Sequence, residues 1–148
     1  MREAQRGKVL AVNISEKKGT RKTNITSCAV VRDFGLKDDA HGGPWHRQVS
    51  LLANESIEKM RAKGLDVTYG DFAENITTEG VDLVHLPIGT AIRIGDSVTL
   101  RVTQIGKVCH ERCAIYYQAG DCVMPKEGIF AEVLNEGEIK VGDEIIIQ

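Results

Sequence analysis

Val98-Thr-Leu-Arg-Val-Thr-Gln-Ile105 is the stretch that decides the fold, because apolar and polar residues alternate along most of it. This period of two is typical of a β-strand with one buried face. The strand is expected to stop at Gly106. Just upstream, Ala91-Ile-Arg-Ile94 has the same character, and Gly95-Asp96 supplies a turn between the two stretches. The whole region therefore predicts a β-hairpin.

Other short segments rich in Val and Ile recur along the chain between turn signals. Strands are expected over residues 8–15, 28–33, 49–52, 75–78 and 144–147, while residues 129–134 fit a short helix or a strand. An Ile/Val-Gly-Asp turn occurs at residues 94–96 and again at 141–143, which we interpret as recurring hairpin chemistry. Seven or eight short strands predict a mainly β protein, a β-barrel with a few short helices.

The clearest helix in the sequence runs from Asn54 to Gly64. Asn54 is a suitable N-terminal cap, and Lys63-Gly64 is a suitable end. Glu55 and Lys59 are spaced for an ion pair on the exposed side of the helix. We expect this helix to be structural.

Length and composition indicate one ordinary globular domain over residues 1–148. The chain has 42% hydrophobic and 27% charged residues and a net charge of −2, so no general affinity for nucleic acid is expected. No apolar run approaches the roughly 20 residues of a membrane helix. Residues 1–7 lack the apolar core of a signal peptide, so we expect a cytoplasmic protein with reduced cysteines.

Two cysteines follow the strand that ends at Ile105. Cys109 and Cys113 have Lys107 just before them, with His110 and Arg112 between them. Nearby cations favour the thiolate, which is the reactive form of cysteine and a soft metal ligand. Small buried thiols are the alternative interpretation. A structural zinc site built from Cys109, Cys113, Cys122 and His110 is a further one, but the spacing matches no familiar zinc pattern and we expect no zinc.

A cationic loop follows the first predicted strand. It contains Lys17, Lys18, Arg21 and Lys22. Such a charge run is either a solvated hairpin tip or a cradle for an anion such as phosphate.

Residues 38–52 form a second dense stretch around the only tryptophan of the chain, Trp45. His41, His46 and Arg47 are candidates for hydrogen bonds to a ligand, and polar contacts that stabilise the loop are the alternative. Asp39 and the two histidines contain metal-ligating groups, but their spacing across a Gly-Gly-Pro turn disfavours a metal site.

A third polar stretch contains Glu74, Asn75 and Thr77. Their donors and acceptors suit either the edge of a heterocycle or a buried structural network. The residues alone leave both interpretations open.

Taken together, these motifs resemble those of the MOSC domain family, the module named for the C-terminal part of molybdenum cofactor sulfurase. The matching segments occur in the family's order across nearly the whole chain: residues 17–19, 39–52, 70–78, 86–96 and 106–113. The chain is most similar to the small stand-alone bacterial members. The resemblance implies a closed MOSC-type β-barrel and a functional cysteine in the loop after the strand.

The same resemblance implies binding of a molybdopterin-type molybdenum cofactor, or handling of the sulfur destined for it. Cys109 matches the family's Gly-Lys-x-Cys form and Cys113 its Arg-Cys form, with one extra residue in this loop. We favour Cys109 as the persulfide carrier or molybdenum ligand, because it lies nearer the end of the strand. The family's association with pyridoxal phosphate applies only at family level.

Cofactor contacts are then expected from cations near the phosphate and polar groups near the pterin. The candidates are Lys17, Lys18, Arg21, Lys22, His41, His46, Arg47, Glu74, Asn75, Thr77, Lys107 and Arg112. The expected function is a cofactor-binding or sulfur-carrier module, with a persulfide-donating desulfurase as a possible partner. The alternative is a molybdenum-dependent reductase of N-hydroxylated compounds that receives electrons from another protein.

Overall fold

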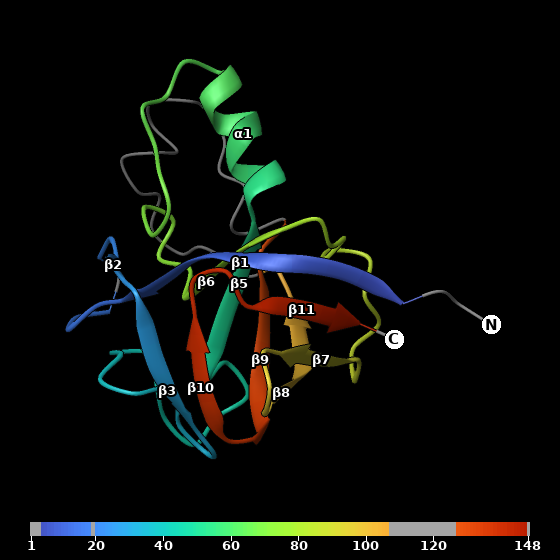
Figure 1. The fold of residues 1–148 in the computed structure, drawn as a ribbon. Helices are drawn as coiled ribbons and strands as arrows, with labels where there is room; N and C mark the ends of the chain where they lie inside the picture. Colours follow the sequence, from blue (N-terminus) through green and yellow to red (C-terminus); the bar gives the residue numbers. More distant parts are fainter. Residues whose placement is uncertain (1–3, 19, 107–126, 148) are drawn as a thin grey trace.

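Seven strands close a β-barrel in the computed structural model, which describes residues 4–18, 20–106 and 127–147 (Figure 1). The order around the barrel is β1 (Gln5–Ile14), β11 (Glu144–Ile147), β7 (Ala91–Ile94), β8 (Val98–Ile105), β9 (Ile129–Asn135), β5 (Val49–Ala53) and β6 (Ile76–Glu79), which pairs back onto β1. The predicted β-barrel and the β7–β8 hairpin are confirmed. The ambiguous stretch at residues 129–134 is a strand.

The long strand β1 closes the barrel because successive parts of it pair with different neighbouring strands. Its first part pairs with β11 from Gln5 to Lys8, and its middle pairs with β6 from Lys8 to Val12. Its end, from Val12 to Ile14, pairs with the short strand β2 (Thr23–Ile25). The cationic loop is therefore the connection of the β1–β2 hairpin, next to the barrel wall.

Strands β5 and β6 are parallel, unlike the other paired neighbours in the barrel. A parallel pair needs a crossover connection, and this one contains α1 (Asn54–Ala62). The helix lies beyond one end of the barrel in Figure 1. Its apolar face forms a second small core with residues from the crossover, β5 and β9: Leu52, Ile57, Met60, Val67, Phe72 and Phe130.

The ends of α1 differ in part from the sequence prediction. Lys63 and Gly64 close the helix as expected, and Gly64 has a φ of +90°. The predicted cap by Asn54 is wrong, because Ala53 occupies the N-cap position and no side chain caps the helix. The Glu55–Lys59 pair is also wrong. Glu55 instead accepts a hydrogen bond from the Gly80 amide at 3.0 Å, and Lys59 pairs with Glu127 at 2.9 Å.

A separate three-stranded sheet lies beside the barrel, with β3 (Ser27–Val31) between β10 (Gly137–Lys140) and β4 (Gly35–Leu36). The second Gly-Asp turn, at residues 142–143, carries the chain from β10 in this sheet to β11 in the barrel. It is therefore not a hairpin turn, which corrects the sequence interpretation for this copy. The first copy, at Gly95, does join two paired strands.

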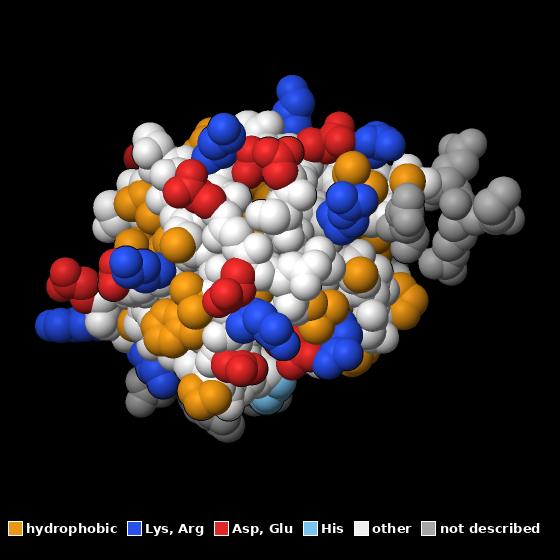
Figure 2. All heavy atoms as spheres, turned by 60° about the horizontal axis from the view of Figure 1, so that its bottom comes forward, with side chains coloured by type: hydrophobic (Ala, Val, Ile, Leu, Met, Phe, Trp, Pro, Cys, Tyr) orange, Lys and Arg blue, Asp and Glu red, His pale blue; other side chains and the backbone are white. Residues whose placement is uncertain are grey.

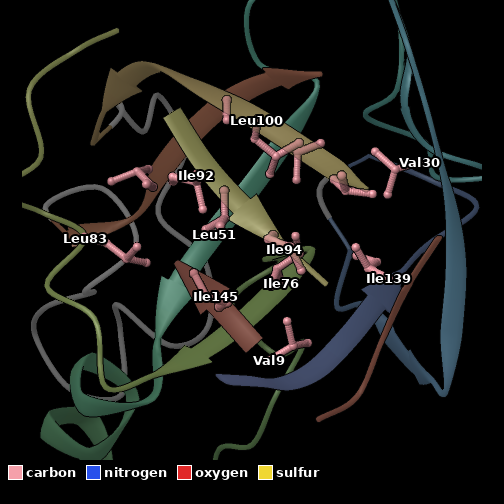
Figure 3. Close-up of a cluster of buried hydrophobic side chains, with 14 of the residues drawn as sticks. Val9, Val30, Leu51, Ile76, Leu83, Ile92, Ile94, Leu100, Ile139 and Ile145 are labelled. Atoms are coloured by element: carbon pink, nitrogen blue, oxygen red, sulfur yellow. The ribbon is translucent and has the colours of Figure 1, made fainter. Parts of the chain in front are cut away.

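Apolar side chains from both sheets fill one core (Figure 3). Leu51, Ile76 and Ile92 are fully buried inside the barrel, while Val30 and Ile139 join the core from the small sheet. Cys28 is also buried in this core, and burial raises the pKa of its thiol. A buried cysteine with a raised pKa is a packing residue rather than a nucleophile.

Charges of both signs alternate on the face shown in Figure 2, where Lys and Arg lie among Asp and Glu. This face has no broad patch of a single sign, in keeping with the small net charge of −2. Within the described part of the chain, no helix has the length and apolar character needed to cross a membrane.

We predict that Leu51→Ala lowers the free energy of unfolding by about 2–5 kcal/mol, because it leaves a cavity at a fully buried site. Ile88→Ala is the control, since Ile88 is 66% exposed and should change stability by less than about 0.5 kcal/mol. Urea denaturation of both variants measures the difference. Equal losses of unfolding free energy in the two variants would contradict the assignment of Leu51 to the barrel core.

Candidate functional site

A pocket of about 240 Å³ lies where the β1–β2 loop and the segment before β5 meet the barrel. Its lining combines cationic, aromatic and small side chains: Lys18, His41, Trp45, Arg47, Ser50, Ala73 and Phe130. Three of the predicted cofactor-binding residues, Lys18, His41 and Arg47, are thus brought together. They come from two loops that the sequence separates by the whole of β2, β3 and β4.

Trp45 organises the cations of this pocket. The guanidinium carbon of Arg47 lies 4.5 Å from the centre of the Trp45 ring and 5.5 Å from that of Phe130. The ammonium of Lys18 lies 5.4 Å from the Trp45 ring centre. The indole N–H donates to the backbone carbonyl of His41 at 2.8 Å, which fixes the ring. Cation–π contacts of this kind contribute roughly 0.5–2 kcal/mol each.

The positive charge of Lys18 and Arg47 is not neutralised within the described part of the chain, because no carboxylate there pairs with either residue. Arg47 Nε is buried and has no hydrogen-bond acceptor among the described residues. A buried donor without an acceptor is costly, and a guanidinium suits planar recognition of an oxyanion. The pocket therefore presents positive charge and an unpaired donor, a combination that suits an anionic group.

Lys22 supplies a further positive charge beside the pocket, and a buried carboxylate neutralises it. Lys22 forms a salt bridge with Asp39 at 2.7 Å, and both side chains are fully buried. The Lys22 ammonium also contacts Ser15 Oγ at 3.0 Å and His41 Nδ1 at 2.9 Å. Burial alone would raise the pKa of Asp39, but hydrogen bonds and the charge of Lys22 hold it below its ordinary value. The Lys22 ammonium therefore lies beneath the pocket lining, bonded to buried Asp39 and Ser15 and to half-buried His41.

The other cations of the loop lie elsewhere. Lys17 and Arg21 line a separate, open depression of about 860 Å³ together with Ser15, Thr20 and Asp38. Arg21 is 3.7 Å from Asp71, at an exposed position. The predicted cluster of four cations thus divides into one pocket residue, one buried residue and two residues of a different surface.

Glu74, Asn75 and Thr77 are fully buried and form a network beneath the pocket. Thr77 donates to Glu74 Oε2 at 2.7 Å, and the Asn13 amide donates to Thr77 Oγ1 at 3.2 Å. Asn75 Oδ1 accepts from the backbone N–H of Ser50 at 2.9 Å. Of the two interpretations left open by the sequence, these contacts match the buried network, which holds Ser50 at the pocket lining.

His46 lies next to the end of β8 and is not among the residues that line the pocket. It is exposed, and its Nε2 donates to Gln104 Oε1 at 2.8 Å. Gln104 in turn donates to the Gly106 carbonyl at 2.7 Å. Because Gln104 is paired with Phe130 across β8 and β9, the wall of the pocket is continuous with the strand end that leads into residues 107–126.

Several predicted residues fall outside the described residues: Lys107, Cys109, His110, Arg112, Cys113 and Cys122. Among the residues that are described, no group of three His, Cys, Asp or Glu side chains could hold a metal ion. Asp39, His41 and His46 do not converge, since the first two bond to Lys22 and the third to Gln104.

Sequence reasoning missed Phe130, which forms the second wall against Arg47. No local signal marks it, because β9 reaches the pocket only through long-range pairing. It also missed the role of Asp39 as the partner of Lys22. Lys22 and Asp39 lie in separate loops, and no spacing rule predicts that two such residues form a salt bridge.

We predict that Glu74→Gln flattens the pH dependence of stability. Burial raises the pKa of the Glu74 carboxyl, so the folded state holds that proton more tightly than the unfolded state. The stabilisation that Glu74 gives by holding this proton is fully present below the unfolded pKa of about 4.3, and it is lost as the pH rises through the folded pKa. The stability of the natural chain minus that of the variant should therefore fall as the pH rises above the unfolded pKa of about 4.3.

Urea unfolding at several pH values measures this difference, with Glu138→Gln at an exposed position as the control. The Asp39 contribution has the opposite sign, lies below about pH 4, and is common to both proteins. A difference that stays constant or grows with pH would show that Glu74 is not held protonated by burial.

Known structures share this fold at low sequence identity. The YuaD protein from Bacillus subtilis aligns with a TM-score of 0.83 at 17% identity, covering 99% of this chain and 98% of that one. YiiM from Geobacillus stearothermophilus gives 0.67 at 18% identity, with 99% and 75% covered. YiiM from Escherichia coli gives 0.67 at 17% identity, with 97% and 69% covered.

No curated protein gives a significant match to the sequence. The family model for the MOSC domain, however, matches residues 37–146, which include the pocket residues from His41 to Phe130, five of the seven barrel strands and most of β11. The match confirms the resemblance carried by the sequence motifs, and the chain belongs to the MOSC domain family.

Proposed function

We propose that this chain binds a molybdopterin-type cofactor through its anionic group and uses a loop cysteine, Cys109 in the first place, to carry sulfur or to ligate molybdenum. The family gives the general association with the molybdenum cofactor. The specific proposal rests on the surroundings of Arg47. Its guanidinium is stacked between two aromatic rings, and its buried Nε lacks an acceptor among the described residues.

The pocket residues fit the anionic part of such a cofactor. Arg47 would bind phosphate oxygens with its planar fork, and His41 would add a donor from the same loop. Lys18 would add a second positive charge from the β1–β2 loop. The volume of about 240 Å³ suits an anionic group with part of the molecule that carries it. When bound, the molybdenum centre of the cofactor supplies two-electron redox or sulfur chemistry.

The position of the pocket supports a role for Cys109. The backbone N–H of Gly106 donates to the Gly128 carbonyl at 2.7 Å, so the two ends of the cysteine-containing segment are held together. Glu127 is also anchored to α1 through Ser56 at 2.7 Å. Cys109 follows Gly106 by three residues, and three residues span at most about 11 Å. The chain therefore allows at most about 11 Å between the Cα atoms of Gly106 and Cys109. The strand that ends before Gly106 pairs with Phe130, which lines the pocket.

The sulfur-carrier step needs no group beyond a thiolate and a persulfide donor. The Cys109 thiolate would attack the outer sulfur of a donor persulfide, form a new S–S bond and release the donor as a thiolate. The transferred sulfur atom and its proton then remain on Cys109. A cysteine desulfurase is the class of protein that presents such a persulfide.

The proposal predicts that Arg47→Leu abolishes retention of the cofactor. A guanidinium hydrogen-bonded to a phosphate contributes about 1.5–3 kcal/mol, so affinity should fall at least tenfold. The protein would be produced in cells that make the cofactor and purified without oxygen. Released pterin is then measured by its fluorescence after oxidation. Arg93→Leu, at an exposed position on β7, is the matched control.

Cys109→Ser and Cys113→Ser complete the experiment. If Cys109 is the sulfur carrier, its serine variant retains pterin but loses the added sulfur in the intact mass spectrum, whereas Cys113→Ser keeps both. Pterin that is absent from the natural protein even after incubation with the cofactor would refute the proposal. Equal retention by Arg47→Leu and Arg93→Leu would refute the assignment of the pocket.

A further inference from the structure

Lys22 contacts three different acceptors through one buried ammonium. Asp39 Oδ1 lies 2.7 Å from Lys22 Nζ, His41 Nδ1 lies 2.9 Å away, and Ser15 Oγ lies 3.0 Å away. The three partners come from three places: the end of β1, the turn after β4 and the residue two positions further on. A lysine ammonium has three donors and no acceptor, so each of these atoms must accept.

The contact with His41 has a chemical consequence. Nδ1 can accept a hydrogen bond from an ammonium only through its lone pair, so it carries no proton. The proton of a neutral imidazole must then reside on Nε2, at the opposite edge of the ring. His41 lines the pocket that contains Arg47 and Lys18. Toward a bound molecule, the Nε2–H edge of His41 can therefore act only as a hydrogen-bond donor.

The charge on Lys22 is fixed by its surroundings. Asp39 is fully buried, and its carboxylate accepts from Lys22, from the Ser15 backbone N–H at 3.1 Å and from the His41 backbone N–H at 3.2 Å. These contacts favour the ionised carboxylate, and an ionised carboxylate favours the ammonium beside it. Asp39 also holds the backbone of His41, so the same pair sets both the place and the tautomer of the ring.

We propose that Lys22 is a positioning residue that holds His41 as its Nε2–H tautomer, so that the pocket offers donors from His41, Arg47 and Lys18 and selects an oxyanion whose oxygens only accept. A fully ionised phosphoryl group belongs to this chemical class. The inference rests on the proposed function for the identity of the ligand, but the tautomer of His41 can be measured without any ligand.

The same network extends to the second cation of the pocket. Ser15 Oγ accepts from Lys22 and donates to the Lys17 carbonyl at 3.0 Å. Thr20 Oγ1 donates to the same carbonyl at 2.9 Å. The backbone next to Lys18 is therefore anchored through Lys22, although the two ammonium groups lie in different environments.

Two-dimensional NMR that correlates the imidazole nitrogens with the ring protons tests the proposal directly. In the natural protein at pH 7.5, without ligand, His41 should show an unprotonated Nδ1 and a protonated Nε2. The spectrum of His41→Gln assigns the signals among the four histidines of the chain. A protonated Nδ1, in either the other tautomer or the imidazolium, would overturn the proposal.

The variants then test whether Lys22 is the cause. Lys22→Met alone leaves Asp39 buried without its partner, so the double variant Lys22→Met/Asp39→Asn is the main one. Its Nδ1 signal should move toward the protonated position as the second tautomer becomes populated. Lys37→Met removes an exposed lysine two residues from Asp39 and should leave the signal unchanged. An identical His41 spectrum in the double variant would overturn the role of Lys22.

Anion binding supplies the second readout, with inorganic phosphate as the probe and the fluorescence of Trp45 as the signal. Trp45 is the only tryptophan and lines the pocket, so its emission reports on this site. The double variant should bind phosphate about three- to tenfold more weakly than the natural protein, because one donor is no longer fixed. Unchanged phosphate affinity in a variant with a shifted tautomer would overturn the selection of the anion by His41.

The outcomes separate this inference from the proposed function. If His41 shows the predicted tautomer and phosphate binds, but no pterin is ever retained, the cofactor assignment fails and the positioning role stands. If pterin is retained through Arg47 while His41 has the other tautomer, the positioning role fails and the cofactor assignment stands.

Discussion

The positive charge of Lys22 has no access to water, and its compensation by Asp39 is the constraint on which the rest of the site depends. An isolated ammonium in the interior would cost several kcal/mol, so the chain must bring a carboxylate to it. That requirement ties the turn after β4 to the hairpin of β1 and β2. Removing one partner from such a buried pair destabilises a protein by about 3–5 kcal/mol.

The same pair explains why the neighbouring pocket stays positively charged. Asp39 is the carboxylate nearest in sequence to His41 and Trp45, and its charge is already matched by Lys22. Lys18 and Arg47 are instead held by the faces of aromatic rings, which attract a cation without neutralising it. An anion that enters this pocket therefore meets charge that the described residues do not compensate. The barrel supplies the rigid wall through Ser50 and Phe130.

Much of the barrel was predictable because strands such as β7 and β8 alternate with a period of two, and because segments rich in Val and Ile are separated by turns that contain glycine. The details that failed depended on distant partners. Asn54 suits a helix cap by type, yet Ala53 takes that position where β5 runs directly into α1. The Gly-Asp turn at residues 142–143 has the chemistry of a hairpin, but the strands on its two sides pair with different neighbours.

The candidate site was predictable in its residue types and only partly in its geometry. A run of cations after β1 predicts an exposed loop or an anion cradle, and it contains no sign that Lys22 alone turns inward. Burial of that lysine depends on Asp39 and on the Ser15 hydroxyl, which local patterns do not reveal. Arg47 was identified from its dense polar surroundings. Its second aromatic neighbour, Phe130, belongs to a strand at the other end of the chain.

A crystal structure of the protein bound to the cofactor would test the assignment of the Arg47 pocket most directly. We expect density for the phosphoryl group in contact with Arg47 and His41, beside the Trp45 ring, with the Lys22–Asp39 pair unchanged beneath it. Density for that group in the open depression of Lys17 and Arg21, with the Arg47 pocket containing only water, would contradict this assignment.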